Sequence, residues 1–191
     1  MESLALKWTR LVPIAGLVAA AAAFAGPPEY ADVMVQGGGG VLAENGMMVK
    51  RQPKGLRISS SIPTPAPGSY QYPAGGEVGH PEVFTLWAFI FNYPELCSDN
   101  DCGMNDLGNT MAQGGAYNVG GHAVGSGGML NIAGRIAVGE EPFAGVPLQS
   151  PETAEVHTAI APHGALDPST LPGEFRSPTG PSSIWWVGII Y

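Results

Sequence analysis

The chain has 191 residues, of which 16 are acidic and 8 are basic, so its formal net charge at pH 7 is −8. Nucleic-acid binding requires clustered lysine and arginine side chains, and the few basic residues here are dispersed along an acidic chain, which excludes nucleic acid as an expected partner. The 28 glycines and 18 prolines are spread throughout the chain and favour short strands and turns over long helices.

Residues 1–25 have the pattern of a secretory signal peptide. A positive start from Lys7 to Arg10 is followed by an apolar run and then by Ala23-Phe24-Ala25, the small-residue pattern that signal peptidase cleaves. The apolar run is shorter than the roughly 20 residues that a membrane span needs. We therefore expect cleavage after Ala25, export to the periplasm or medium, and one domain over residues 26–191 without a membrane span. The alternative, an N-terminal core helix, does not explain the flanking signals.

Two cysteines, Cys97 and Cys102, lie close together in the sequence. In an oxidising compartment, a disulfide between them is the default prediction. A redox-active pair is the alternative, but the spacing is not C-x-x-C and no helix start follows the second cysteine.

The first strands are expected in the N-terminal half. Val41 to Glu44 and Met47 to Lys50 flank Asn45-Gly46, a dipeptide typical of the tight type I′ turn, so this segment predicts a β-hairpin. Leu56 and Ile58 alternate with polar residues and indicate a half-buried strand. Glu82 to Asn92 is apolar at both parities, which predicts a central strand covered on both faces.

Further strands are expected over residues 116–124, 130–138, 156–160 and 184–191, with glycine-rich and proline-rich loops between them. The pattern predicts an all-β fold, an antiparallel β-sandwich or barrel of about eight strands with long loops. Edge strands of such a sheet leave self-association open.

A histidine-rich set is the first candidate site. Glu155 and His157 are two residues apart, so on a strand both side chains point to one face, about 7 Å apart. Such strands host copper or zinc in β-sandwiches. His163 shares this parity but reaches the same ion only if the chain turns close to it, and His122 would have to come from a neighbouring strand. The alternative is that these histidines are hydrogen-bonded structural or surface residues.

An acidic loop around the cysteines is the second candidate. Asp99, Asp101 and Asp106 concentrate carboxylates in a short stretch, and Ca²⁺ prefers six to eight oxygen ligands from such loops. Aspartate, asparagine and glycine are also ordinary turn residues, so a solvated turn is the alternative. Ser126 lacks the G-x-S-x-G context of a hydrolase nucleophile. Tyr70, Tyr72, Trp185 and Trp186 are candidates for a carbohydrate-binding face. The favoured alternative is that Trp185 and Trp186, which point to opposite faces of a strand, are both buried in a two-sided core.

An ordered set of motifs covers a little under half of the chain: Phe84-Thr85-Leu86-Trp87, Phe91-Asn92-Tyr93-Pro94-Glu95, Cys97, Cys102-Gly103, Asp106-Leu107, Gly121-His122, Ala154-Glu155-Val156-His157 and His163-Gly164. Their order resembles a group of secreted bacterial proteins with no assigned function. The histidine-containing strand and the apolar closing strand are also similar to chordin-type (CHRD) domains, which are extracellular β-structures. The resemblance implies export, the disulfide and a β fold. It singles out His122, Glu155, His157 and His163 as positions to test, and neither resemblance assigns a reaction.

The sequence therefore predicts an exported, acidic β module that binds a ligand or serves a structural role without catalysis. The alternative is a copper or zinc protein, and less so a calcium protein, with enzymatic activity left open. The metal alternative would use His122, Glu155, His157 and His163, and calcium would use the acidic loop.

Overall fold

The computed structural model describes residues 25–36, 39–64, 81–99, 101–124, 128–176 and 186–191. Nine antiparallel strands form one sheet in the order β6-β3-β2-β1-β9-β8-β4-β5-β7. The strands are β1 Glu29–Val35, β2 Val41–Gln52, β3 Gly55–Pro63, β4 Glu82–Phe91, β5 Gly114–Val124, β6 Met129–Ala137, β7 Ala144–Gly145, β8 Glu155–Ala165 and β9 Trp186–Ile190. Three short 3₁₀ helices are η1 Pro94–Leu96, η2 Met104–Gly108 and η3 Gly173–Arg176. This architecture confirms the predicted all-β antiparallel fold. Among the described residues, no helix is long and apolar enough to cross a membrane.

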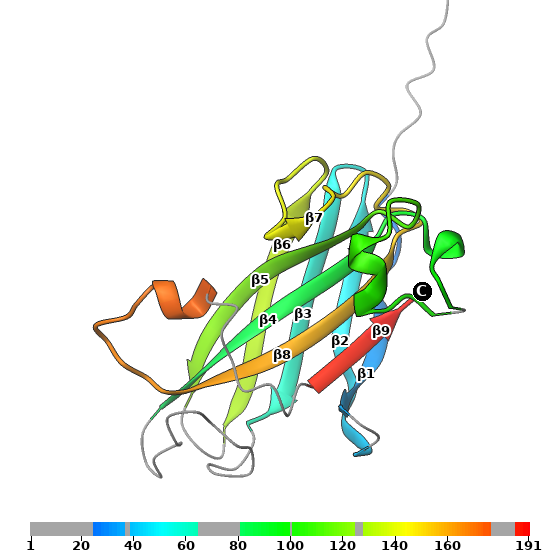
Figure 1. Cartoon of the computed structure of the whole chain (residues 1–191). Helices are drawn as coiled ribbons and strands as arrows, with labels where there is room; N and C mark the ends of the chain where they lie inside the picture. Colours follow the sequence, from blue (N-terminus) through cyan, green and yellow to red (C-terminus); the bar gives the residue numbers. More distant parts are fainter. Residues whose placement is uncertain (1–24, 37–38, 65–80, 100, 125–127, 177–185) are drawn as a thin grey trace, which may run out of the picture.

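The sheet curls into a half-barrel (Figure 1). Its inner face holds the hydrophobic core. Alternation along each strand produces this arrangement, because every second side chain points to the same face. Leu56, Ile58 and Ile62 of β3 point inward and are fully buried, while Arg57 between them is exposed. The core residues come from strands at both ends of the sheet, so the curl is stabilised by burial across the interior.

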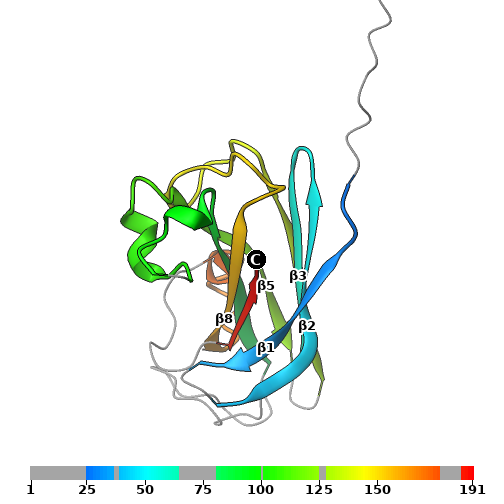
Figure 2. The same cartoon turned by 90° about the vertical axis from the view of Figure 1, so that its right-hand side faces the viewer.

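Strand β4 lies between β8 and β5 and is covered on both faces, as the sequence predicts. Its core side chains, Phe84, Leu86, Ala88 and Ile90, belong to the inner cluster. The residues of opposite parity, among them Trp87 and Phe91, lie on the outer face and are also buried. Segments outside the sheet therefore cover the outer face at this strand. One of them is the segment that carries the disulfide, which stands beside β8 in both views (Figures 1 and 2).

The predicted hairpin at Asn45-Gly46 is wrong, because β2 runs without a turn from Val41 to Gln52. Its pairing with β1 shifts register on either side of Val33, which marks a β-bulge. Asn45 has a φ of 51°, the left-handed region that asparagine tolerates. Its N–H donates to the Asp32 carboxylate at 2.8 Å. The Asn-Gly dipeptide therefore bends a strand instead of reversing the chain.

Candidate functional site

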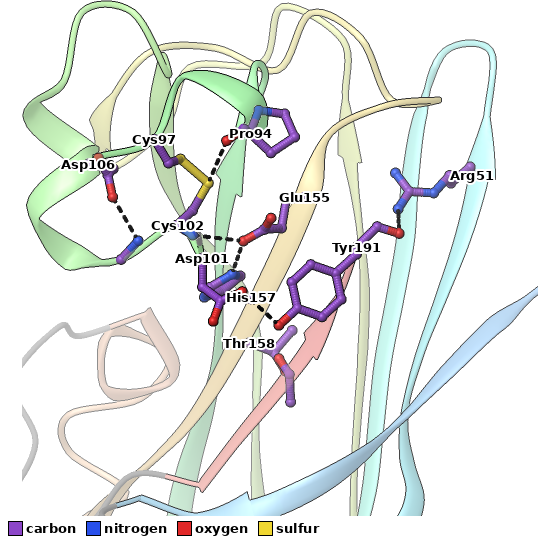
Figure 3. Close-up of polar contacts among 12 residues, drawn as sticks. Arg51, Pro94, Cys97, Asp101, Cys102, Asp106, Glu155, His157, Thr158 and Tyr191 are labelled. Carbon is purple, nitrogen blue, oxygen red and sulfur yellow. Dashed lines mark hydrogen bonds and ion pairs between the residues drawn. A yellow bond between two sulfur atoms is a disulfide. The ribbon is translucent and has the colours of Figure 1, made fainter. Parts of the chain in front are cut away.

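Glu155 and His157 lie side by side on the outer face of β8, as their spacing predicts. Nε2 of His157 is 2.5 Å from Oε1 of Glu155 (Figure 3). The Glu155 residue is 4% exposed, so its carboxylate is withdrawn from bulk water. A buried carboxylate needs hydrogen-bond donors, and His157 supplies one.

The disulfide loop supplies a second donor to the same oxygen. The backbone N–H of Cys102 donates to Oε1 of Glu155 at 3.2 Å. Cys102 is bonded to Cys97, which confirms the predicted disulfide. Phe91, opposite Glu155 on β4, packs edge-on against the His157 ring with 5.4 Å between ring centroids. The pair is thus held from a neighbouring strand and from the loop.

A cavity of about 260 Å³ adjoins His157 on this face; we call it the outer-face cavity. It lies over β4, β8 and β9 and is bounded by the start of η2. Its lining is mostly apolar and consists of Gln36, Phe89, Phe91, Gly103, Met104, His157, Thr158, Ala159, Val187 and Ile189. An apolar pocket with a few polar groups at its wall is the usual form of a small-molecule site.

The ring nitrogens of His157 have different environments. Nε2 faces the Glu155 carboxylate, which favours a hydrogen on that nitrogen. Nδ1 is then the ring atom left for another partner. In the neutral ring it accepts a hydrogen bond, and in the protonated ring it donates one. The pair can therefore orient a polar group of a bound molecule, or hold a proton next to it.

The Asp106 carboxylate organises the disulfide loop. It accepts hydrogen bonds from the N–H and the hydroxyl of Ser98, the N–H of Gly103 and the side-chain amide of Asn109. The hydroxyl and N–H of Ser98, followed by the N–H of Gly103, lower the pKa of Asp106 from 3.8 to about 2. Asp106 is 2% exposed, so its oxygens face the loop itself.

The other two predicted calcium ligands do not join Asp106 in one group. Asp99 is exposed, and Asp101 accepts a hydrogen bond from the Tyr191 hydroxyl at 3.3 Å. Partial desolvation of the hydroxyl, followed by the carboxylates of Asp101 and Glu155, raises the pKa of Tyr191 from its ordinary value. The geometry of the described part of this loop is that of a self-bonded turn.

His163 lies on the outer face at the far end of β8, away from the Glu155–His157 pair. The strand is continuous between them, so six residues separate His157 from His163 by about 20 Å. Nε2 of His163 is 2.8 Å from the Thr85 hydroxyl, which also accepts the indole N–H of Trp87. The turn that would bring the two histidines to one ion is absent from this described strand.

His122 lies on the opposite face of the sheet. It pairs with Phe84, a core residue, and its Nδ1 accepts the N–H of Asn131 on β6 at 3.3 Å. Of the four predicted copper or zinc ligands, the structure therefore brings together only Glu155 and His157. Within the described residues, no three His, Cys, Asp or Glu side chains are placed to hold a metal ion.

Several candidate residues from the sequence lie in parts of the chain that the structure does not describe. Tyr70, Tyr72, Ser126 and Trp185 fall outside the described residues, as does the fourth histidine, His80. Trp186 is part of β9, but its side chain is not described.

The sequence did not reveal the residues that line the outer-face cavity. Phe89, Met104 and Ile189 come from three distant segments, and they meet only because β9 pairs with β8 and η2 lies above them. The available signal was the apolar character of both faces of residues 82–92, which indicated a covered outer face.

Comparison with known proteins finds no family model, no curated protein and no solved structure that matches this chain. The resemblances to secreted bacterial proteins and to chordin-type domains stay predictions.

Proposed function

We propose that this chain is an exported, non-catalytic binding module that takes a small, mainly apolar molecule into the outer-face cavity. The observation that carries the proposal is the cavity itself. Its walls are mainly aromatic and aliphatic, and its few polar side chains include His157, which is hydrogen-bonded to Glu155 behind it. At about 260 Å³ the cavity is slightly below the usual range for drug-sized ligands, so the ligand is small.

Burial of apolar ligand surface provides the affinity, and His157 provides the orientation. About 25 cal/mol is gained per Å² of apolar surface removed from water. The hydrogen bond from the His157 ring to Glu155 fixes that ring, so little rotamer entropy is lost when a ligand binds. Export is supported by the signal-peptide pattern of residues 1–25 and by the Cys97–Cys102 disulfide, which suits an oxidising compartment.

The test uses the protein secreted by an expression host, with two small probes, indole and cyclohexanol. We expect either probe to shift the NMR methyl signals of Val187 and Ile189. Ala159→Leu should weaken this response, because the larger side chain fills the cavity. Ala133→Leu is the matched control, since Ala133 is exposed on β6 and outside the cavity lining. If neither probe moves these signals and native mass spectrometry finds no co-purified small molecule, the binding function is wrong.

The alternative function, copper or zinc binding, keeps two of its four predicted ligands in one place, Glu155 and His157. Metal analysis of the secreted protein, purified without chelator, tests it directly. If the parent protein contains near-stoichiometric copper or zinc and His157→Ala does not, metal binding replaces the binding-module proposal. The intact mass of the same sample tests export, and we expect a first residue of Gly26.

A further inference from the structure

Three basic side chains form a line across the outer face of β2, β3 and β6, and we call them the cationic row. Lys50 pairs directly with Arg57, and Arg57 pairs directly with Arg135. Adjacent strands are about 4.8 Å apart, so three positive charges follow one another at roughly that spacing. The row lies outside the cavity lining. Its strands β2 and β3 form the side of the sheet away from the disulfide segment (Figure 2).

The arrangement of the cationic row is electrostatically unfavourable for the isolated protein. Like charges directly opposite each other on neighbouring strands destabilise a sheet. Within the described part of the chain, the three side chains form no ion pair and no hydrogen bond. Acidic residues outnumber basic ones 16 to 8, so the sequence had acids available for pairing. An unpaired line of cations in such a chain points to an external anion.

The surroundings leave the row accessible. Arg57 and Arg135 are exposed, and Lys50 is half-buried. The positions on either side of the row along β3 and β6 carry small residues: Gly55, Ser59, Ala133 and Ala137. Glu140, beside β6, accepts the N–H of Ala137 at 2.8 Å, and no described contact joins it to Arg135. A surface with small neighbouring side chains and three cations in line suits an extended ligand that lies across the strands.

We propose that the cationic row binds an acidic polysaccharide that carries carboxylate or sulfate groups on successive units. The charge spacing is comparable with the length of one sugar unit in an extended chain. The planar guanidinium groups of Arg57 and Arg135 match carboxylate or sulfate oxygens with two parallel hydrogen bonds each.

The negative net charge of the whole protein disfavours two other common polyanions, duplex DNA and anionic lipid bilayers. Duplex DNA and anionic bilayers present dense negative charge over a large area, and a chain of net charge −8 is repelled by them. Binding to DNA depends on many neutralised phosphates, about 6–10 in a salt-sensitive complex, and the row supplies three cations. A single polysaccharide strand is narrow, so it contacts the cationic row without covering the acidic remainder of the protein surface.

The test measures binding of the secreted protein to polygalacturonate and dextran sulfate at low ionic strength, with neutral dextran, duplex DNA and phosphatidylserine vesicles as comparisons. We expect at least one acidic polysaccharide to bind, and binding to weaken as salt is added, because exposed charges are screened. Each change of Lys50, Arg57 or Arg135 to glutamine should lower the affinity about two- to fivefold. The matched control is Arg176→Gln, an exposed arginine on η3, which should bind like the parent protein.

Folding of the variants is checked by thermal denaturation. Arg57→Gln should melt at or above the temperature of the parent protein, because it removes repulsion from both neighbours. Lower affinity together with unchanged or higher stability separates a binding role from a structural one. The proposal is overturned if neither polysaccharide binds at low salt, or if the triple glutamine variant binds as well as the parent. It is also overturned if DNA or vesicles bind to the row as tightly as the polysaccharides do.

Discussion

The backbone N–H of Cys102 donates a hydrogen bond to the buried carboxylate of Glu155, so the disulfide loop and strand β8 meet beside the outer-face cavity. The next residues of the loop, Gly103 and Met104, form part of the cavity lining. A change in the loop is therefore felt at the cavity, and a change in Glu155 is felt in the loop.

Removal of the disulfide should weaken both stability and ligand binding. The bond closes a short loop, and loop-closure entropy gives about 2 kcal/mol of stabilisation for such a bond. We expect Cys97→Ser/Cys102→Ser to lower the free energy of unfolding by about that amount in urea titrations. Probe shifts at Ile189 should also weaken, because Gly103 and Met104 lose their fixed position. Equal probe binding before and after reduction of the parent protein would show that the loop does not shape the cavity.

Glu155 is expected to be a strong stability determinant. Glu155→Ala leaves the N–H groups of Cys102 and His157 without their acceptor in a buried place, at a cost of about 3 kcal/mol. Glu155→Gln retains one acceptor oxygen and should cost clearly less. Chemical denaturation of both variants measures the difference. Similar losses in both variants would mean that packing, and not hydrogen bonding, sets the contribution of Glu155.

Local pattern was sufficient to predict much of this fold. Alternation predicted β3, β6 and β8, the doubly apolar run predicted the covered strand β4, and the cysteine spacing predicted the disulfide. The shared face of Glu155 and His157 also followed from alternation. These features depend on neighbours in the sequence, which is why they can be read from it.

Features that depend on register could not be predicted. The pairing of β4 with β5 shifts between Leu86 and Trp87, and His122, which pairs with Phe84 beyond this shift, lies on the inner face. The cationic row is invisible in the sequence, because Arg57 and Arg135 meet only through the pairing of β3 with β6. Asn45-Gly46 lies in the β2 bulge, where Asn45 has a positive φ. The same dipeptide favours a tight turn, so local propensity does not distinguish the bulge from a turn.

Asp106 should make the disulfide loop sensitive to acid. The pKa of the Asp106 carboxyl is about 2 in the folded protein and 3.8 when the carboxyl is outside the folded structure. Between these two pH values the unfolded chain therefore binds more protons than the folded protein. The contribution of Asp106 to stability is therefore complete above about pH 4 and is lost as the pH falls through about 2. Urea titrations at pH 5 and pH 2 should show that the difference between the parent and Asp106→Asn shrinks on acidification. A difference that is independent of pH would contradict the hydrogen-bonded role of this carboxylate.

Arg51 should be required for the fold, unlike the exposed arginines. Its guanidinium donates to the Glu29 carboxylate at 2.8 Å. It also donates to the carbonyl oxygens of Pro151, Ala154 and Tyr191 at 2.8, 2.7 and 3.3 Å. Arg51→Met leaves these acceptors unpaired, and we expect a loss of about 3 kcal/mol in the free energy of unfolding.

Two further variants refine the Arg51 test. Arg51→Lys keeps the charge but cannot reproduce the planar fork, so it should recover only part of the loss. Arg176→Met, on the exposed η3, should change stability by less than about 0.5 kcal/mol. Full recovery in Arg51→Lys would show that charge alone, and not the four-way hydrogen bonding, is what the fold requires.

Gly134 should control how closely β6 approaches β5. A Cβ atom at this position would lie 2.1 Å from the carbonyl oxygen of Val119, a distance that only a backbone shift can relieve. We expect Gly134→Ala to push the two strands apart and to lower stability by about 2 kcal/mol. Hydrogen exchange should accelerate at amides of β5 and β6. Gly120→Ala, on the opposing strand, is the matched control, because its Cβ would meet Ile132 at an ordinary 3.4 Å. Equal effects of the two substitutions would mean that glycine at residue 134 is not required by this approach of the strands.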